Sequence, residues 1–182
     1  MCDPVGLSLA QNASIMKKIL LLLPLALMLV MCKSTKRKTT ATAGKISNIS
    51  YSEKFKGASA AETARLLKTL DASAETKSVL VLTQNFIGGE VTVVSAGKQV
   101  YKGYPITDKG TGLAERIAIS NTADTRVFDS YTGNEVVLSA SDTKKYKFAY
   151  VARTGKPKPA YKVLYSTKLK VFKPKKQKTA AR

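Results

Sequence analysis

The side chains that most often carry out catalysis are scarce in this chain of 182 residues. Histidine is absent and cysteine occurs only at positions 2 and 32, so Ser–His and Cys–His pairs, histidine-ligated metals and a four-cysteine zinc site are excluded. Paired carboxylates for glycoside hydrolysis could come from Asp108, Glu115, Asp124, Asp129, Glu135 and Asp142. Nothing in the sequence pairs two of them, and no Trp accompanies them as a stacking platform. The sequence therefore predicts no cofactor or metal and disfavours an enzyme, with an envelope hydrolase left as an alternative.

The segment Ser95-Ala96-Gly97-Lys98 has the S-x-x-K spacing found in penicillin-binding proteins and serine β-lactamases. In that family the serine begins a helix. Here Ala96-Gly97 is typical of a tight turn between two strands. We therefore expect a hairpin at this position and no catalytic serine.

One cysteine follows a segment that predicts export. Met16-Lys17-Lys18 precedes thirteen uncharged residues, Ile19 to Met31, and Cys32 comes directly after them. Two positive charges before a short apolar run are typical of a secretory signal peptide, whereas a membrane-spanning helix needs ~20 apolar residues. The sequence predicts a signal peptide over 1–31. Residues 1–15 lack the basic start of such a peptide, so translation is expected to begin at Met16.

Leu29-Val30-Met31-Cys32 resembles the lipobox of bacterial lipoproteins, although Met31 stands where that family has Gly, Ala or Ser. The resemblance implies that Cys32 becomes the first mature residue and carries a diacylglycerol and an acylated amine. More than one acyl chain makes membrane binding stable. The expected location is the bacterial cell envelope, on the periplasmic or surface side, with the membrane as a partner through the lipid anchor.

Secretion without lipid is the main alternative, with cleavage after Ala41-Thr42-Ala43, and an uncleaved anchor is another. In the lipoprotein hypothesis, residues 32–58 hold the lipidated Cys32 and a flexible basic tether. Four cations, Lys33, Lys36, Arg37 and Lys38, lie close together at the start of this tether. Basic residues beside an anionic leaflet contribute roughly 1 kcal/mol each to membrane binding.

Charge is distributed very unevenly along the chain. The sequence has 31 Lys and Arg against 12 Asp and Glu, a formal net charge of +19. Residues 45–143 hold equal numbers of basic and acidic side chains, whereas residues 144–182 hold fourteen basic ones and no acid. A neutral body with a basic end predicts an anionic partner, although it says nothing about the fold.

The elements that position these residues are one helix followed by strands. Ser59 with Glu62 has the form of a capping box, and it predicts a helix at about 60–71. The apolar stripe expected to face the sheet comprises Ala60, Ala64 and Leu67, with Leu66 and Leu70 alongside. After Ser78 the apolar period changes from 3.6 to 2, which indicates strands. We expect eight, at 78–86, 90–95, 98–105, 113–120, 125–131, 135–140, 144–153 and 160–172.

Short strands joined by tight turns are typical of an antiparallel β-sandwich or small barrel, so the predicted fold is a mainly β sandwich over 59–172, followed by a disordered basic tail at 173–182. Between Glu90 and Ile119 the layout of turns resembles transthyretin-like or carboxypeptidase-regulatory-like β-sandwich modules. The residues concerned are Val91, Val93, Gly97, Lys98, Val100, Tyr101, Gly103, Thr107, Asp108, Gly110, Ile117 and Ile119. This resemblance implies a non-catalytic scaffold.

The last two predicted strands alternate between aromatic and basic residues. Tyr146, Phe148 and Tyr150 are expected on one face and Lys147 and Arg153 on the other, while Tyr161, Val163 and Tyr165 are expected in the core. A basic sheet face running into the tail is predicted to bind polyanions through Lys147, Arg153, Lys156, Lys158, Lys162, Lys168, Lys170, Lys173, Lys175 and Lys176. Lysines on strands that only prevent aggregation and keep the protein soluble are the alternative.

The predicted ligand is an anionic envelope glycan or lipid headgroup. Nucleic acid is disfavoured because stacking of bases needs aromatic and basic residues on the same face, and the alternation separates them. The leading hypothesis is a membrane-anchored envelope lipoprotein that displays a small β-sandwich as a structural or binding module. The alternative is a secreted, soluble polyanion-binding protein. The sequence leaves the oligomeric state open.

Overall fold

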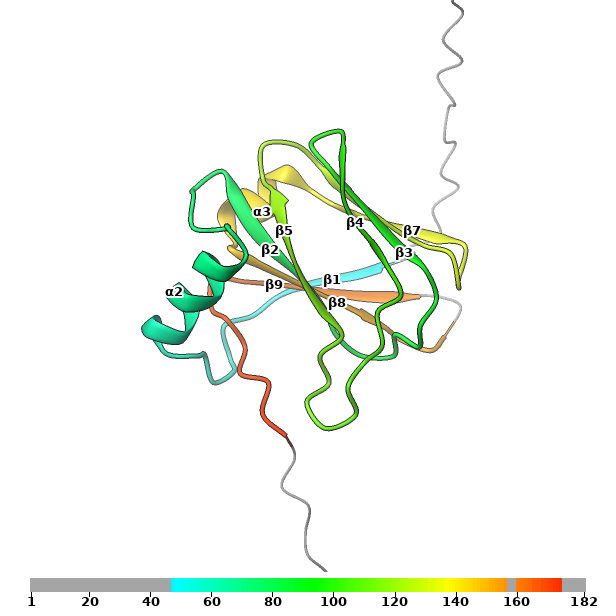
Figure 1. Cartoon of the computed structure of the whole chain (residues 1–182), viewed down its shortest axis with the longest axis horizontal. Helices are drawn as coiled ribbons and strands as arrows, with labels where there is room; N and C mark the ends of the chain where they lie inside the picture. Colours follow the sequence, from blue (N-terminus) through cyan, green and yellow to red (C-terminus); the bar gives the residue numbers. More distant parts are fainter. Residues whose placement is uncertain (1–46, 157–159, 175–182) are drawn as a thin grey trace, which may run out of the picture. The chain divides into compact units, whose positions relative to one another are not determined.

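The computed structural model describes residues 47–156 and 160–174 (Figure 1). Two helices lie within these ranges, α2 (Ala60–Thr69) and α3 (Ala140–Lys145). The strands there are β1 (Ser47–Tyr51), β2 (Lys77–Leu82), β3 (Val91–Ser95), β4 (Lys98–Gly103), β5 (Glu115–Ser120), β6 (Thr125–Asp129), β7 (Asn134–Leu138), β8 (Phe148–Arg153) and β9 (Tyr161–Ser166).

The strands form two sheets that pack as a sandwich. One sheet has five strands in the order β1-β9-β8-β2-β5, and the other has four in the order β4-β3-β6-β7. The four-stranded sheet is antiparallel throughout. The five-stranded sheet is mixed, because β1 pairs with β9 and β2 pairs with β8 in parallel. The predicted mainly β sandwich is therefore confirmed, with parallel pairs inside one sheet.

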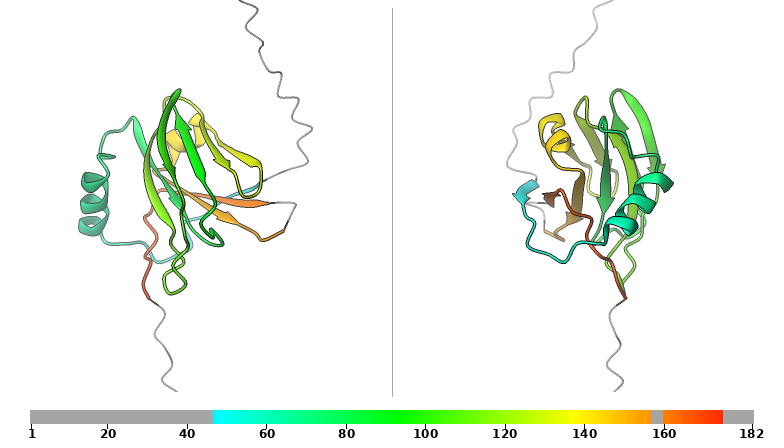
Figure 2. Two further views of the ribbon diagram at one scale, coloured as in Figure 1. Left: turned by 45° about the vertical axis from the view of Figure 1, so that its right-hand side comes forward. Right: turned by 90° about the vertical axis from the view of Figure 1, so that its left-hand side faces the viewer.

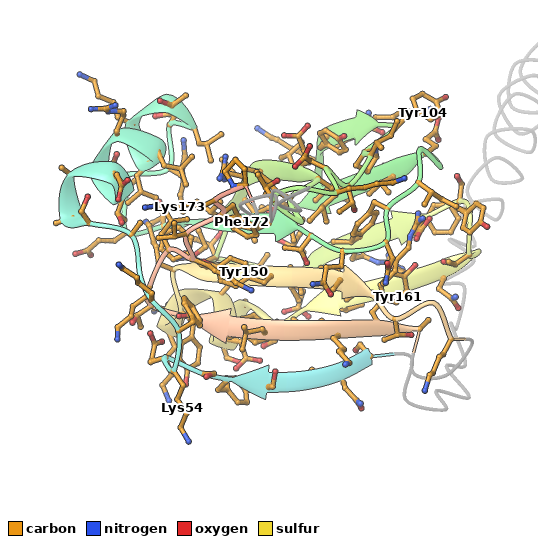
Figure 3. The ribbon with its side chains drawn as sticks, turned by 90° about the horizontal axis from the view of Figure 1, so that it is seen from below. Lys54, Tyr104, Tyr150, Tyr161, Phe172 and Lys173 are labelled. Atoms are coloured by element: carbon orange, nitrogen blue, oxygen red, sulfur yellow. The ribbon has the colours of Figure 1, made fainter. Side chains whose placement is uncertain are left out.

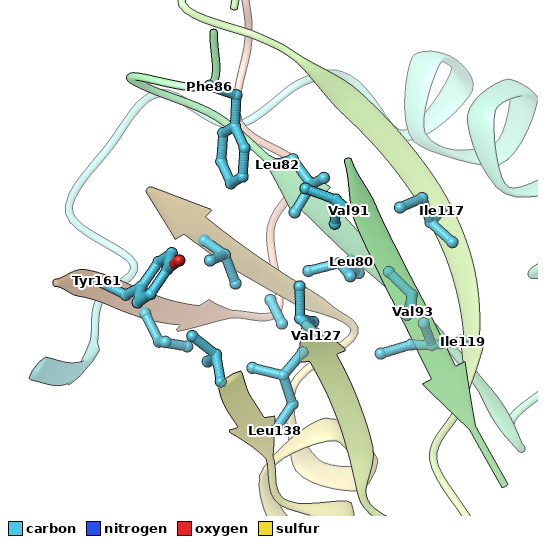
Figure 4. Close-up of a cluster of buried hydrophobic side chains, with 14 of the residues drawn as sticks. Leu80, Leu82, Phe86, Val91, Val93, Ile117, Ile119, Val127, Leu138 and Tyr161 are labelled. Atoms are coloured by element: carbon cyan, nitrogen blue, oxygen red, sulfur yellow. The ribbon is translucent and has the colours of Figure 1, made fainter. Parts of the chain in front are cut away.

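The main core lies between the two sheets. Leu80 and Leu82 of β2 and Val151 of β8 meet Val93 and Val127 of the four-stranded sheet, and all five are buried (Figure 4). Tyr161, Val163 and Tyr165 of β9 point into the same core, as their alternation predicted. Burial of apolar surface here supplies most of the stabilisation of the sandwich.

A second apolar cluster covers the other face of the five-stranded sheet. Helix α2 lies on that side, away from the four-stranded sheet (Figure 2), and packs Leu66, Leu67 and Leu70 near Val79 and Val81. Adjacent residues of β2 thus enter different clusters, and residues 78–82 are all buried. A strand buried on both faces reads as a continuous apolar run, which is how β2 stands in the sequence.

The helix α2 begins as the capping box predicts. The Ser59 hydroxyl accepts the Glu62 backbone N–H at 3.2 Å, and the Glu62 carboxylate accepts the Ser59 backbone N–H at 2.9 Å. The part of the predicted stripe that contacts the sheet is its C-terminal half. Ala60 and Ala64 are exposed because the sheet lies beside the second half of the helix.

The three largest local differences from the sequence prediction concern residues 47–51, residues 140–145 and the end of β9. Residues 47–51, part of the predicted flexible tether, form β1 against β9, which lies more than a hundred residues later in the chain. Residues 140–145 form α3, capped by Ser139, where the sequence suggested strand ends. β9 ends at Ser166, well before residue 172. In each case a long-range contact or a short cap outweighs the local pattern.

Candidate anion-binding site

Seven of the ten basic residues predicted to bind polyanions lie in the described part of the chain, and they do not share one sheet face. Arg153 pairs with Tyr161, whose side chain points into the core, whereas Lys162 pairs with Ala152 on the outer face of the five-stranded sheet. Lys158, Lys175 and Lys176 lie outside the described residues, as does Cys32.

Arg153 belongs to the interior and not to a ligand-binding face. Its side chain is 4% exposed and forms a two-pronged ion pair with Asp129, Nε to Oδ2 at 2.6 Å and Nη2 to Oδ1 at 2.5 Å. The Tyr161 hydroxyl donates to the same carboxylate at 2.6 Å. Burial, followed by this hydrogen bond, raises the pKa of Tyr161. With its charge neutralised inside the sandwich, Arg153 is unavailable to a polyanion.

Lys147 also has a structural role. Its Nζ donates to the backbone carbonyls of Ala74 at 2.9 Å and Lys77 at 2.7 Å, so it ties the start of β8 to the start of β2. Burial lowers the pKa of Lys147. Phe148 and Tyr150 share one face as predicted, but the prediction is wrong for Tyr146, which packs against the main core. Lys147 contacts protein rather than a free surface.

Two of the predicted lysines line a groove on the outer face of the five-stranded sheet. Lys162 of β9 and Lys170, which follows that strand, border a hollow of about 260 Å³. Its other walls include Tyr150 and Phe172 and the hydroxyl residues Ser50, Thr83 and Thr111. The groove therefore combines cations, aromatic rings and hydroxyls, which are the groups that bind oxyanions and hydroxylated polymers.

Phe172 divides this groove from a second hollow of about 240 Å³ on the side of α2. Lys170 and Phe172 line both hollows, and Arg116 and Lys173 line the second one. The Arg116 guanidinium lies 5.6 Å and the Lys170 Nζ 5.9 Å from the centre of the Phe172 ring. Figure 3 shows Phe172 beside Tyr150, with Lys173 toward α2, and the two rings are 6.3 Å apart. We call the two hollows together the Phe172 groove.

Tyr150 fixes the floor of the Phe172 groove. Its hydroxyl donates to the Lys168 carbonyl at 2.9 Å and accepts the Lys170 backbone N–H at 2.7 Å. Burial raises the pKa of Tyr150 to about 12. The irregular segment after β9 is thereby held over β8, so the position of Lys170 is set by a buried tyrosine.

Three cations of the Phe172 groove have no ion-pair partner among the described residues. Within residues 47–156 and 160–174, neither Lys162, Lys170 nor Arg116 forms an ion pair with a carboxylate. The Arg116 Nε is buried with no hydrogen-bond partner there, and desolvation lowers the pKa of Arg116. Glu62 is the acid in the wall, and its carboxylate is engaged by Ser59. The hydrogen bonds from Ser59, together with the charge of Lys173, lower the pKa of Glu62, so this carboxylate offsets part of the positive charge. The groove still carries an excess of positive charge.

Arg116 was missed by the sequence analysis. It lies in the neutral part of the chain and outside the basic end, and nothing in its immediate sequence marks it. It faces the groove because it pairs with Val81, whose side chain belongs to the outer cluster. Only the alternation of β5 around the buried Ile117 and Ile119 indicated that Arg116 would point away from the main core.

The remaining predicted lysines lie in other places. The Lys168 Nζ reaches the Glu53 carbonyl at 3.5 Å and the Lys168 side chain packs beside Gly57. Lys156 borders a separate hollow near Arg153. Of the seven described residues, Lys162, Lys170 and Lys173 are therefore the ones that the fold brings together at the groove.

The residues considered for catalysis hold structural positions. Ser95 is buried at the end of β3, where its hydroxyl bonds that of Thr125 at 2.8 Å, and Ala96-Gly97 forms the expected hairpin turn with positive φ at both residues. Asp124 accepts the Ala140 backbone N–H at 2.8 Å at the start of α3. The Asp108 carboxylate accepts the Thr111 N–H at 2.6 Å, and its hydrogen bonds with Thr111 lower the pKa of Asp108.

Comparison with known proteins adds no assignment: no protein-family model matches the chain, and a search of the curated proteins gave no match. No helix in the part that the structure describes has the length and apolar character needed to cross a bilayer. The described residues likewise contain no cluster of three or more potential metal-ligating side chains. The predictions for function therefore depend on the chain's own residues.

Proposed function

We propose that this protein is a membrane-anchored lipoprotein of the bacterial envelope whose β-sandwich binds an anionic glycan or lipid headgroup in the Phe172 groove. The observation that carries the proposal is the set of unpaired cations, Lys162, Lys170 and Arg116, around an aromatic ring in a hollowed surface. A cation with an acidic partner, such as Arg153, stabilises the fold and is not available to a ligand. These three cations form no ion pair among the described residues.

The physical reason is that a hollow lined by charges of one sign concentrates the electric field and attracts ions of the opposite sign. The Ser50, Thr83 and Thr111 hydroxyls donate their protons within the protein, so they can accept hydrogen bonds from sugar hydroxyl groups. The Phe172 ring offers an apolar surface for the ligand's carbon skeleton. Because the groove is open to solvent, added salt should weaken the attraction.

The anchor part of the proposal rests on the sequence. An apolar run that ends at Cys32, followed by the Lys33 to Lys38 cluster, is suited to a lipidated first residue and a tether beside an anionic leaflet. A sandwich displayed in this way would meet envelope polymers and headgroups before any cytoplasmic ligand.

Heparin chromatography of the full-length chain tests the groove. Lys162→Met with Lys170→Met should lower the salt concentration at elution clearly. The matched control is Lys98→Met with Lys144→Met, which removes the same charge from exposed lysines outside the groove, and its elution should shift much less. Equal shifts for both pairs would mean that only net charge matters and that the lysines serve solubility.

Vesicle binding then identifies the source of the anion. Sedimentation with vesicles of anionic phospholipid, compared with vesicles of zwitterionic phospholipid, should be lost in the groove pair and kept in the control pair if headgroups are the ligand. If the protein binds a polyanionic glycan but sediments equally with both kinds of vesicle, the ligand of the groove is a glycan.

Labelling with radioactive palmitate tests the anchor independently. The wild-type chain expressed in bacteria should incorporate label, and Cys32→Ser should not. Equal incorporation by both would reject lipidation at Cys32. Release of an unlabelled wild-type protein into the medium would support the secreted alternative.

A further inference from the structure

A third hollow, at the other end of the sandwich from α2, combines an exposed aromatic ring with fixed hydrogen-bond acceptors. It encloses about 640 Å³, within the range of small-molecule sites, and lies among the turns that follow β2, β6 and β8. Its lining includes Asn85, Tyr131, Asn134 and Lys156. We call it the Tyr131 hollow; none of its lining residues contributes to the Phe172 groove.

Tyr131 is held by several contacts although the residue is 63% exposed. The Arg153 guanidinium is stacked between the Phe86 ring at 4.6 Å and the Tyr131 ring at 5.1 Å, and Asp129 holds that guanidinium in place. Asp129 also accepts the Tyr131 backbone N–H at 3.1 Å. On the other side the backbone approaches so closely that a Cβ at Gly89 would lie 2.5 Å from the Tyr131 Cβ. The buried ion pair therefore positions an exposed ring.

Two asparagines present oriented acceptors in the same hollow. The Asn85 amide donates from Nδ2 to the Arg153 carbonyl at 2.8 Å, and the Asn134 amide donates from Nδ2 to the Thr132 carbonyl at 3.1 Å. Each side-chain carbonyl oxygen is left without a partner among the described residues. Two acceptors held in this way can receive hydrogen bonds from a ligand that carries hydroxyl donors.

Lys156 supplies the positive charge of the Tyr131 hollow. It is exposed and makes no ion pair with any acid in the described ranges, whereas the charge of Arg153 is cancelled by Asp129. A ligand that matches this wall has an apolar face for stacking on Tyr131, hydroxyl donors for the asparagines, and an anionic group for Lys156.

We propose that the Tyr131 hollow binds a carboxylated sugar, a uronic acid residue of a glycan. The C–H face of a pyranose ring packs on Tyr131, its hydroxyls donate to Asn85 and Asn134, and its carboxylate pairs with Lys156. Arg153 is a positioning residue, since it acts through the Tyr131 ring. This site is independent of the Phe172 groove and of the lipid anchor.

Titrations of the ¹⁵N-labelled full-length chain followed by NMR test the site. The probes are trisaccharides of galacturonic and glucuronic acid, the neutral trisaccharides of galactose and glucose, and adenosine monophosphate as a planar anion. The acidic sugars should shift the side-chain amide signals of Asn85 and Asn134 and bind most tightly. Absence of shifts with both acidic sugars, or tighter binding of the nucleotide, would overturn the proposal.

Single substitutions test what each side chain of the Tyr131 hollow contributes to the affinity for the sugar. Tyr131→Ala should weaken binding of the acidic sugar at least tenfold, whereas Tyr131→Phe, which keeps the ring, should stay within about twofold. Lys156→Met should reduce the affinity for acidic sugars to that for neutral ones. Tyr104→Ala removes another exposed tyrosine, 66% exposed and outside the hollow, and should bind as the wild type does. Unchanged affinity in Tyr131→Ala would refute the site.

Variants of the Phe172 groove and of the Tyr131 hollow distinguish the two proposed binding sites from each other. The groove pair, Lys162→Met with Lys170→Met, should bind the acidic trisaccharide as the wild type does. Loss of trisaccharide binding in that pair, with Tyr131→Ala unaffected, would place the sugar in the Phe172 groove and overturn the Tyr131 site.

Discussion

Neutralising Asp129 should destabilise the sandwich severely. The carboxylate is 1% exposed and its partner Arg153 is 4% exposed, so Asp129→Asn leaves a buried guanidinium with no compensating charge. Removing one partner of a buried ion pair costs about 3–5 kcal/mol, a large share of a typical stability of about 5–15 kcal/mol. With a urea dependence of about 2 kcal/mol per M, a loss of about 4 kcal/mol lowers the unfolding midpoint by about 2 M.

The exposed pair of Arg126 and Glu135 provides the matched control for this measurement. It has the same two-pronged geometry, but its side chains are 57% and 29% exposed, and such pairs contribute about 0–1 kcal/mol. Urea unfolding of the full-length chain at pH 7, followed by circular dichroism, should therefore barely change in Glu135→Gln. Adding Arg153→Met to Asp129→Asn should restore part of the lost stability, because the orphaned charge is removed.

Unfolding of Asp129→Asn at the same urea concentration as Glu135→Gln would contradict a large cost for the unpaired charge of Arg153. That result would mean that the Arg153 guanidinium reaches water in the adjoining Tyr131 hollow at little cost. A double variant that loses as much unfolding free energy as Asp129→Asn and Arg153→Met lose separately, added together, would also contradict the ion pair, since the two side chains would then be energetically independent.

Two further predictions concern α2 and the alkaline limit of stability. Ser59→Ala should cost about 1 kcal/mol in thermal unfolding because the Glu62 N–H loses its acceptor, whereas Thr63→Ala in the same helix should cost nothing; equal losses would contradict the cap. Because the pKa of Tyr150 rises from 10.0 to about 12, the unfolded chain releases this proton first. The contribution of Tyr150 to stability is then complete below pH 10 and falls by roughly 3 kcal/mol toward pH 12. Tyr150→Phe should flatten this decline, and an unchanged slope would refute the assignment.

Strand positions could be predicted because their signals are local. The run Val79 to Leu82 predicts a strand whichever sheet it joins, and the alternation in β9 places Tyr161, Val163 and Tyr165 in the core without knowledge of the partner strand. Gly97 favours a turn because glycine adopts positive φ without strain, whereas Ala96 takes its positive φ only as part of the hairpin.

The candidate site could be predicted only in part. Lys162 and Lys170 were marked by the basic end of the chain, but Arg116 enters the groove from the neutral part of the sequence. Arg153 was assigned to an exposed face because alternation gives the two sides of a strand and not which side is buried. In β8 both sides are buried, one under α2 and the other under the second sheet.

The sequence by itself determined the excess of positive charge, the absence of histidine chemistry, the apolar run ending at Cys32, and the strand and turn periodicities, because composition and neighbouring residues encode these directly. Tertiary structure alone decided that β1 joins β9 in parallel, that Asp129 neutralises Arg153, and that Arg116 meets Phe172. The reason is that burial and charge pairing depend on residues far apart in the chain. The ion pairs of the folded structure determine which lysines remain available to a ligand.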